Sequence, residues 1–201
     1  MRSKRQENMD RQAGAMNLQT VSGPLPEADA DQIALAERIA RHEYWEHRDI
    51  YGDPYIRHAE RISTLVPIWA KPAAWLHDTI EHCGLSASQL VAAGVSGATV
   101  DAVVLMSFRG EDCGVAGGTY DEYIKTIAGA RNRAGTIARR VKLATLADHA
   151  ERVRRMSGAD VDATVRRLER SRAVISAAMK IYGEEHSSTL SPPSKKQQIA
   201  V

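Results

Sequence analysis

The sequence predicts an all-α protein, a bundle of helices whose folded part spans residues 30–184. Apolar residues recur at helical spacing in several segments, and residues that cap helices stand at the segment boundaries. No segment shows the sustained alternation of β-branched residues that is typical of strands. In the first segment, 30–48, Ile33, Ala36 and Ile39 fall on one helical face, which predicts the first helix.

Proline, glycine and aspartate indicate the limits of two further helices. A helix is expected over 54–66, because Asp53 suits the N-cap and Pro54 the first helical position. The next helix is expected over 72–83, because Gly84 follows it at a position that favours a left-handed residue.

Two capping boxes predict where later helices begin. In each box a serine or threonine precedes a glutamine or glutamate by three residues, so that side chains and backbone N–H groups satisfy one another. Ser86 with Gln89 begins a short helix that ends at Gly94. Thr119 with Glu122 begins another helix.

Composition separates a loop and two tails from the helices. The glycine-rich segment 110–118 is expected to be an exposed loop, followed by long helices over 136–156 and 161–182. Residues 1–29 and 185–201 lack an apolar face, so we expect a disordered N-terminal arm and a disordered C-terminal tail. We expect both to be removable without unfolding the domain.

Charge and cysteine content restrict the class of protein. A formal net charge of +2 in 201 residues does not indicate the dense basic stripe of a nucleic-acid-binding protein, although it is compatible with a small anionic ligand. Cys83 and Cys113 are too few for a disulfide framework. The opening is charged and no apolar run of membrane-spanning length follows it. We therefore expect a cytoplasmic protein with a small nucleotide or similar anionic partner, without nucleic-acid or membrane partners.

Histidines gather on or beside the expected helices. Five of the seven lie there: His42, His58, His77, His82 and His149. On the helix over 72–83, four polar residues stand three or four positions apart and can share one wall: His77, Asp78, Glu81 and His82. Imidazole and carboxylate groups are ligands that divalent metal ions accept. The alternative is a solvated polar face, but Trp75 and Ile80 give this helix an apolar surface to bury.

Three segments together resemble one family. GDPYIRHAERI, AAWLHDTIEHC and RRVKLATLADHAERV, at their spacing in this chain, resemble the hydrolase domain of RelA/SpoT-type alarmone enzymes and their small single-domain relatives in the HD superfamily. The resemblance spans roughly residues 30 to 180 and implies an HD-domain helical bundle. It further implies that His58, His77 and Asp78 bind Mn²⁺ and that Glu81 positions the attacking water.

The chain departs from the family pattern at two positions. Where the family has Glu followed by Asp, this chain has Glu81 followed by His82, and histidine also transfers protons near neutral pH. Where the family reads KLAD, this chain reads KLAT, with Thr145 at the position of the last metal ligand. Asp148, one turn later, is the candidate for that ligand, and otherwise three protein ligands remain. His149 is a candidate for contact with metal or substrate.

The resemblance implies a reaction, the removal of pyrophosphate from the 3′ position of a guanosine alarmone such as (p)ppGpp. Arg48, Arg57 and Lys142 are the candidates for holding its phosphates. Two alternatives stay open from the sequence. One is a nucleotide-binding protein that has the fold without turnover, and the other is a hydrolase of a different nucleotide phosphate, because fold does not fix substrate.

Overall fold

The computed structural model describes residues 30–108, 119–156 and 160–184. Within these residues the chain is helical, and the one pairing of strand type is an isolated bridge between Arg48 and Pro54. The expected all-α class is confirmed. The expected N-terminal arm, glycine-rich loop and C-terminal tail lie outside the described residues. The expectation that both tails can be removed without unfolding the domain therefore stays a prediction.

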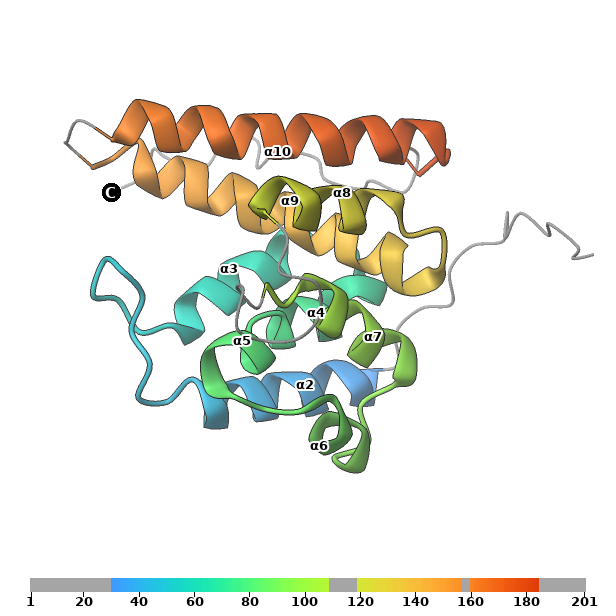
Figure 1. Ribbon diagram of the computed structural model, residues 1–201. Coiled ribbons are helices and arrows are strands. Elements are labelled where there is room, and N and C mark those ends of the chain that lie inside the picture. Colours follow the sequence, from blue (N-terminus) through green and yellow to red (C-terminus); the bar gives the residue numbers. More distant parts are fainter. Residues whose placement is uncertain (1–29, 109–118, 157–159, 185–201) are drawn as a thin grey trace, which may run out of the picture.

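The described residues contain ten helical segments in chain order. They are α2 (Ala30–Glu43), α3 (Ile56–Leu65), the 3-10 helix η1 (Ile68–Ala70), α4 (Lys71–Leu76), α5 (Thr79–Cys83), α6 (Ala87–Ala92), α7 (Gly97–Met106), α8 (Tyr120–Gly129), α9 (Arg133–Val153) and α10 (Val161–Ile181). Figure 1 shows α8, α9 and α10 together at the top and the other helices below them. The two groups meet along α9.

Helix α9 is the central element of the bundle. It packs against α10 and α8 on one side and against α7, α3 and α4 on the other. Its buried apolar side chains include Ile137, Val141 and Leu146, and burying one such side chain stabilises a fold by about 1.5–3 kcal/mol. Because α9 is covered on both sides, the polar side chains that it carries into the interior need partners there.

Both capping boxes are present as predicted. The Ser86 and Thr119 hydroxyls each accept a backbone N–H three residues on, and the backbone N–H of each donates to the side chain of Gln89 or Glu122. Gly84, after α5, has a φ of 73°, the left-handed conformation expected there. Local sequence rules therefore locate these helix ends.

The expected start of the second helix is wrong. Helix α3 begins at Ile56 rather than at Pro54, and Asp53 does not cap it. Pro54 pairs with Arg48 in the isolated bridge, and the Asp53 carboxylate forms an ion pair with Arg152. A partner distant in the sequence thus takes the side chain that would otherwise have capped the helix.

The third expected helix is interrupted. Helix α4 ends at Leu76 and α5 begins at Thr79, so His77 and Asp78 lie in the break. The Thr79 hydroxyl donates to the Leu76 carbonyl (2.8 Å), and the Asp78 N–H donates to the Tyr44 hydroxyl (3.3 Å). These bonds stabilise the break, so the four polar residues do not share one continuous helical wall.

Two further differences concern the ends of the first helix and the presence of α7. Helix α2 ends at Glu43, five residues earlier than predicted, and the chain continues in turns in which the Trp45 N–H donates to the His42 carbonyl and the His47 N–H to the Tyr44 carbonyl. Helix α7 was not predicted. Its apolar residues are spread around the helix instead of lying on one face, so helical periodicity does not reveal it.

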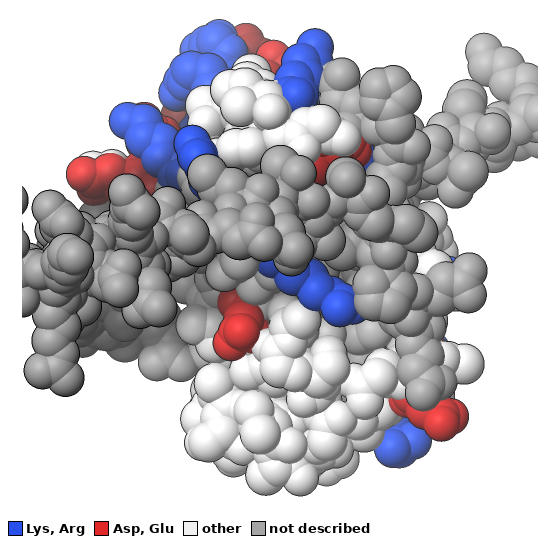
Figure 2. All heavy atoms as spheres, turned by 90° about the vertical axis from the view of Figure 1, so that its right-hand side faces the viewer, with Lys and Arg blue, Asp and Glu red and all other residues white. Residues whose placement is uncertain are grey.

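The surface carries both signs of charge. On the face seen in Figure 2, acidic side chains stand among the lysines and arginines, and the described residues of that face form no continuous basic stripe. No helix in the described part of the chain is long and apolar enough to cross a membrane. A cytoplasmic location stays a prediction.

Candidate metal centre

Three side chains from separate elements converge in the interior. His58 lies on α3, His77 directly follows α4, and Asp78 directly precedes α5. One possible ligand atom from each lies within 4.8 Å of the other two, and the residues are only 3%, 2% and 9% exposed. The structure thus brings together three of the four predicted metal ligands. Two imidazoles and a carboxylate form a donor set that suits a divalent transition ion.

Hydrogen bonds fix which nitrogen each imidazole presents to this group. Nδ1 of His77 lies 2.9 Å from the Ala74 carbonyl, and Nδ1 of His58 lies 2.9 Å from Oδ2 of Asp148. Both partners are acceptors, so both Nδ1 atoms donate. The two Nε2 atoms face each other at 3.2 Å. Their lone pairs would repel at that distance unless a proton or a metal ion lies between them.

Asp78 supplies negative charge to the same point. Its Oδ2 lies 2.9 Å from Nε2 of His77 and accepts a hydrogen bond from the Tyr55 hydroxyl. Burial alone would raise the pKa of the Asp78 carboxyl, but His77 outweighs burial and holds it well below its ordinary value. Burial and the Asp78 charge raise the pKa of Tyr55, so its hydroxyl stays a donor. A carboxylate therefore stands ready beside the two nitrogens.

Asp148 lies outside this three-residue group. Besides His58, its carboxylate contacts Arg61 twice, at 2.6 Å from Nε to Oδ1 and at 3.0 Å from the terminal nitrogen to Oδ2. Burial opposes ionisation, but the bonds from His58 and Arg61 lower the pKa of Asp148 well below its usual range. Thr145 is buried, and its hydroxyl donates to the Val141 carbonyl of its own helix (3.1 Å).

A cavity of about 300 Å³ lies beside His58. His82 and His149 also line it, together with four arginines: Arg48, Arg61, Arg152 and Arg167. The ring of His149 stacks on that of His58, with 4.9 Å between centroids. Burial and the nearby His58 lower the pKa of His149 to about 4, so it is neutral at pH 7. The cavity combines imidazole and guanidinium groups.

Glu81 and Lys142 lie near the group but do not line the cavity. Oε2 of Glu81 accepts the Phe108 N–H (2.9 Å), and Nζ of Lys142 lies 4.9 Å from the centre of the Tyr123 ring. Partial loss of hydration, followed by the charge of Asp78, raises the pKa of Glu81 above its ordinary value. Glu81 therefore exchanges protons more readily near neutral pH than an isolated glutamate.

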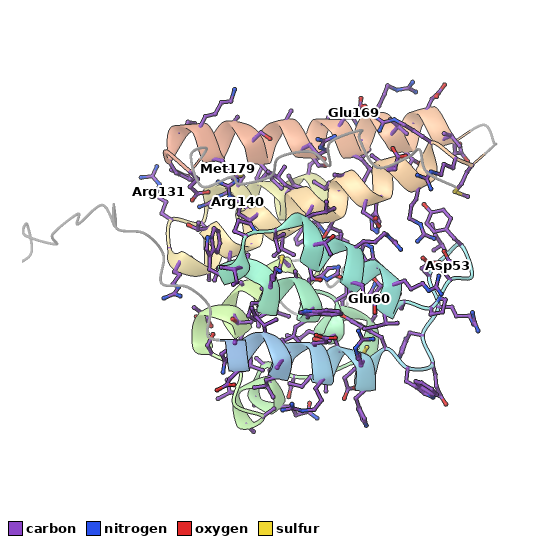
Figure 3. All side chains as sticks on the ribbon, turned by 180° about the vertical axis from the view of Figure 1, so that it is seen from behind. Asp53, Glu60, Arg131, Arg140, Glu169 and Met179 are labelled. Carbon is purple, nitrogen blue, oxygen red and sulfur yellow. The ribbon has the colours of Figure 1, made fainter. Side chains whose placement is uncertain are left out.

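The loop between α2 and α3 forms one wall of the cavity. Arg152 on α9 holds it, with a terminal nitrogen 2.8 Å from Asp49 and 3.0 Å from Asp53, and its guanidinium lies 4.1 Å from the Tyr51 ring centre. Figure 3 shows Asp53 on this loop. The sequence places Arg152 on one helical face with Lys142, Thr145 and His149, but it does not predict these contacts, because the partners stand about a hundred positions away.

The predicted phosphate-binding arginines have different positions. Arg48 lines the cavity and donates to the Gly52 carbonyl (2.8 Å). Arg57 is exposed on α3 and is not part of the lining. Arg61, which was not singled out, does line it. The sequence offers one signal for Arg61: it follows His58 by three residues, so the two side chains are neighbours on the surface of α3.

Comparisons with known proteins add no family assignment. Neither a scan against models of protein families nor a search of curated proteins gives a match for this chain. The functional interpretation therefore depends on the geometry of the site and on the sequence resemblance.

Proposed function

We propose that this chain is a metal-dependent phosphohydrolase of the HD type that acts on a nucleotide phosphate. One observation carries the proposal: His58 and His77 present their Nε2 atoms to the same point, 3.2 Å apart, next to the Asp78 carboxylate. Each ring is held by an acceptor at Nδ1, which is the usual arrangement of a histidine that binds a metal. The three side chains would hold a divalent ion, and the resemblance favours Mn²⁺.

The bound ion would supply Lewis-acid polarisation of a phosphoryl oxygen. The cavity beside it supports a phosphorylated substrate, because arginines recognise phosphate oxygens through charge-assisted hydrogen bonds. Arg48 and Arg167 line the cavity without a carboxylate in hydrogen-bond contact among the described residues. We assign phosphate binding to these two. We assign Tyr51 and His149, two of the aromatic side chains that line the cavity, to contact with the base.

Hydrolysis of a 3′-pyrophosphate joins a water oxygen to the phosphorus and breaks the bond between that phosphorus and the 3′ oxygen. Glu81 would take a proton from the water, as its raised pKa favours. His82, which lines the cavity, would return a proton to the departing 3′ oxygen. Pyrophosphate and a nucleotide with a free 3′ hydroxyl are the products. A guanosine alarmone is the substrate that the resemblance favours.

One observation favours the second candidate, a nucleotide-binding protein without turnover. Thr145 stands where the family has a carboxylate ligand, and its hydroxyl is bonded to its own helix. With three protein ligands the ion is held less tightly than with four. The nucleotide would still fit the same cavity.

A hydrolysis assay distinguishes the two candidates. The full chain with Mn²⁺ should release pyrophosphate from a 3′-pyrophosphorylated guanosine nucleotide, and His77→Ala should lower the rate at least about 100-fold. Glu169→Gln, a change on α10 that alters the exposed ion pair between Glu169 and Arg154, is the surface control and should keep the rate. Binding of the nucleotide without release of phosphate or pyrophosphate from any member of a nucleotide panel would favour the binding protein.

A further inference from the structure

We propose that Asp148 is a positioning residue that orients His58 toward the metal ion, held in turn by Arg61, and is not itself a metal ligand. This inference rests on the proposed metal site. It assigns Asp148 a role different from the one that its sequence position suggests, and it gives a role to Arg61.

Both carboxylate oxygens of Asp148 are already engaged in hydrogen bonds to other side chains. Oδ1 accepts from Arg61, and Oδ2 accepts from both Arg61 and His58, with distances of 2.6, 3.0 and 2.9 Å. Asp148 is only 8% exposed. It meets His58 at Nδ1, whereas the atom aimed at the metal group is Nε2, on the other side of the ring. To reach the ion, Asp148 would have to break all three bonds.

This arrangement has a chemical consequence for His58. A carboxylate that accepts the Nδ1 proton fixes the tautomer in which Nε2 carries the lone pair, and it makes that nitrogen a stronger ligand. The Ala74 carbonyl orients the His77 ring in the same way. Both rings are thus oriented before the ion arrives, one by backbone and one by the Asp148 side chain.

Arg61 determines how Asp148 presents its oxygens. Its guanidinium makes a two-point contact with the carboxylate, which holds the carboxylate plane in one orientation. Arg61 also puts a positive charge near the site, and that charge by itself opposes cation binding. Removing Arg61 therefore has opposite effects under two hypotheses. Metal binding weakens if Arg61 orients Asp148 and His58, and it strengthens if the freed Asp148 becomes a ligand.

The imidazole tautomer of His58 provides a test in metal-free protein. In the full chain, ¹⁵N NMR of the histidine rings should show the His58 proton on Nδ1. Asp148→Asn should move it to Nε2, because Arg61 retains the amide oxygen and the amide NH₂ then donates to Nδ1. An unchanged His58 tautomer in folded Asp148→Asn would overturn the proposal. Glu169→Gln is the matched carboxylate-to-amide control.

Mn²⁺ titration of the same proteins provides the second readout. Asp148→Asn and Arg61→Gln should each weaken Mn²⁺ binding by about 10 to 100-fold. Thr145→Asp should tighten it at least about 10-fold, because the resemblance puts a carboxylate ligand at this position. Tighter binding in Arg61→Gln, or no effect of Thr145→Asp together with abolished binding in Asp148→Asn, would identify Asp148 as a ligand and overturn the proposal. Arg154→Gln is the control for Arg61, and far-UV circular dichroism checks folding.

Failure of the proposed function gives a different result. If the wild type binds no Mn²⁺ but the His58 tautomer responds to Asp148→Asn, the metal-dependent function fails and the orienting contact holds. If the wild type binds Mn²⁺ and the tautomer does not respond, the orienting role fails and the metal site holds.

Discussion

His58 and His77 show how neighbouring acceptors prepare a side chain for chemistry. Each Nδ1 is bonded to an acceptor, and each Nε2 is therefore directed to the point that Asp78 also faces. Without a metal ion, a proton between the two Nε2 atoms is needed to prevent repulsion between their lone pairs. The residue types and the family motif predicted these three residues, but the acceptors behind them come from tertiary contacts.

The position of Asp148 illustrates the limit of spacing arguments. Thr145 and Asp148 are three residues apart, and the sequence suggests that one can replace the other. A shift of three residues moves a side chain about 4.5 Å along a helix and about 60° around it. That displacement carries the carboxylate behind His58, to Nδ1, where it also meets Arg61. The spacing of residues along the sequence does not determine which of the two imidazole nitrogens a carboxylate contacts.

Cys83 allows a pH test at the residue scale. Burial first, and then the charges of Glu43 and Asp78, raise the pKa of its thiol to about 11. The thiolate is the reactive form and is the form that these effects disfavour, so reactivity should rise with pH only toward 11. At pH 8, alkylation by iodoacetamide should be roughly 100-fold slower than for an unperturbed thiol. The measurement uses Cys113→Ser, and rapid labelling at pH 8 would contradict the account.

At the scale of helices, the capping residues in the sequence predict helix ends better than they predict breaks within a helical segment. Ser86, Thr119 and Gly84 marked helix ends correctly, because caps and left-handed glycines act within one turn of chain. The break at His77 and Asp78 carries neither proline nor glycine. Its hydrogen bonds include one that the Asp78 N–H donates to the hydroxyl of Tyr44, in the turn after α2, so no local signal in the sequence predicts the break.

Gly135 provides a stability test at the start of α9. Its N–H donates to the N-cap Asn132 (2.8 Å), and a Cβ added to Gly135 would lie 2.2 Å from the Ala130 carbonyl oxygen. Helix propensity alone favours alanine by about 0.5–1 kcal/mol. The clash should reverse that sign, so Gly135→Ala should lower the free energy of unfolding in urea by at least about 1 kcal/mol.

Gly97, in the first turn of α7, is the matched control for that substitution. An added Cβ would meet no atom within 4 Å there. Gly97→Ala should therefore be neutral or stabilising. Equal effects of the two substitutions would show that the approach of Gly135 to Ala130 does not constrain the start of α9.

At the scale of the whole molecule, α9 brings the site together. It carries Asp148 and His149 to α3, and Arg152 to the loop before α3, while α10 closes the cavity with Arg167. The helical class follows from periodicity, and the candidate metal ligands His58, His77 and Asp78 follow from the motifs. The cavity wall does not, because its residues come from four separate stretches of the chain whose meeting depends on how α9 and α10 pack.

The central claim is that His58, His77 and Asp78 hold a divalent ion. The most direct test is elemental analysis of the full chain after equilibration with MnCl₂ and removal of free metal, with His77→Ala and Glu169→Gln treated identically. The account predicts about one Mn²⁺ per chain in the wild type and in Glu169→Gln, and a near-complete loss in His77→Ala. No bound ion in the wild type, or an equal amount in His77→Ala, would contradict it.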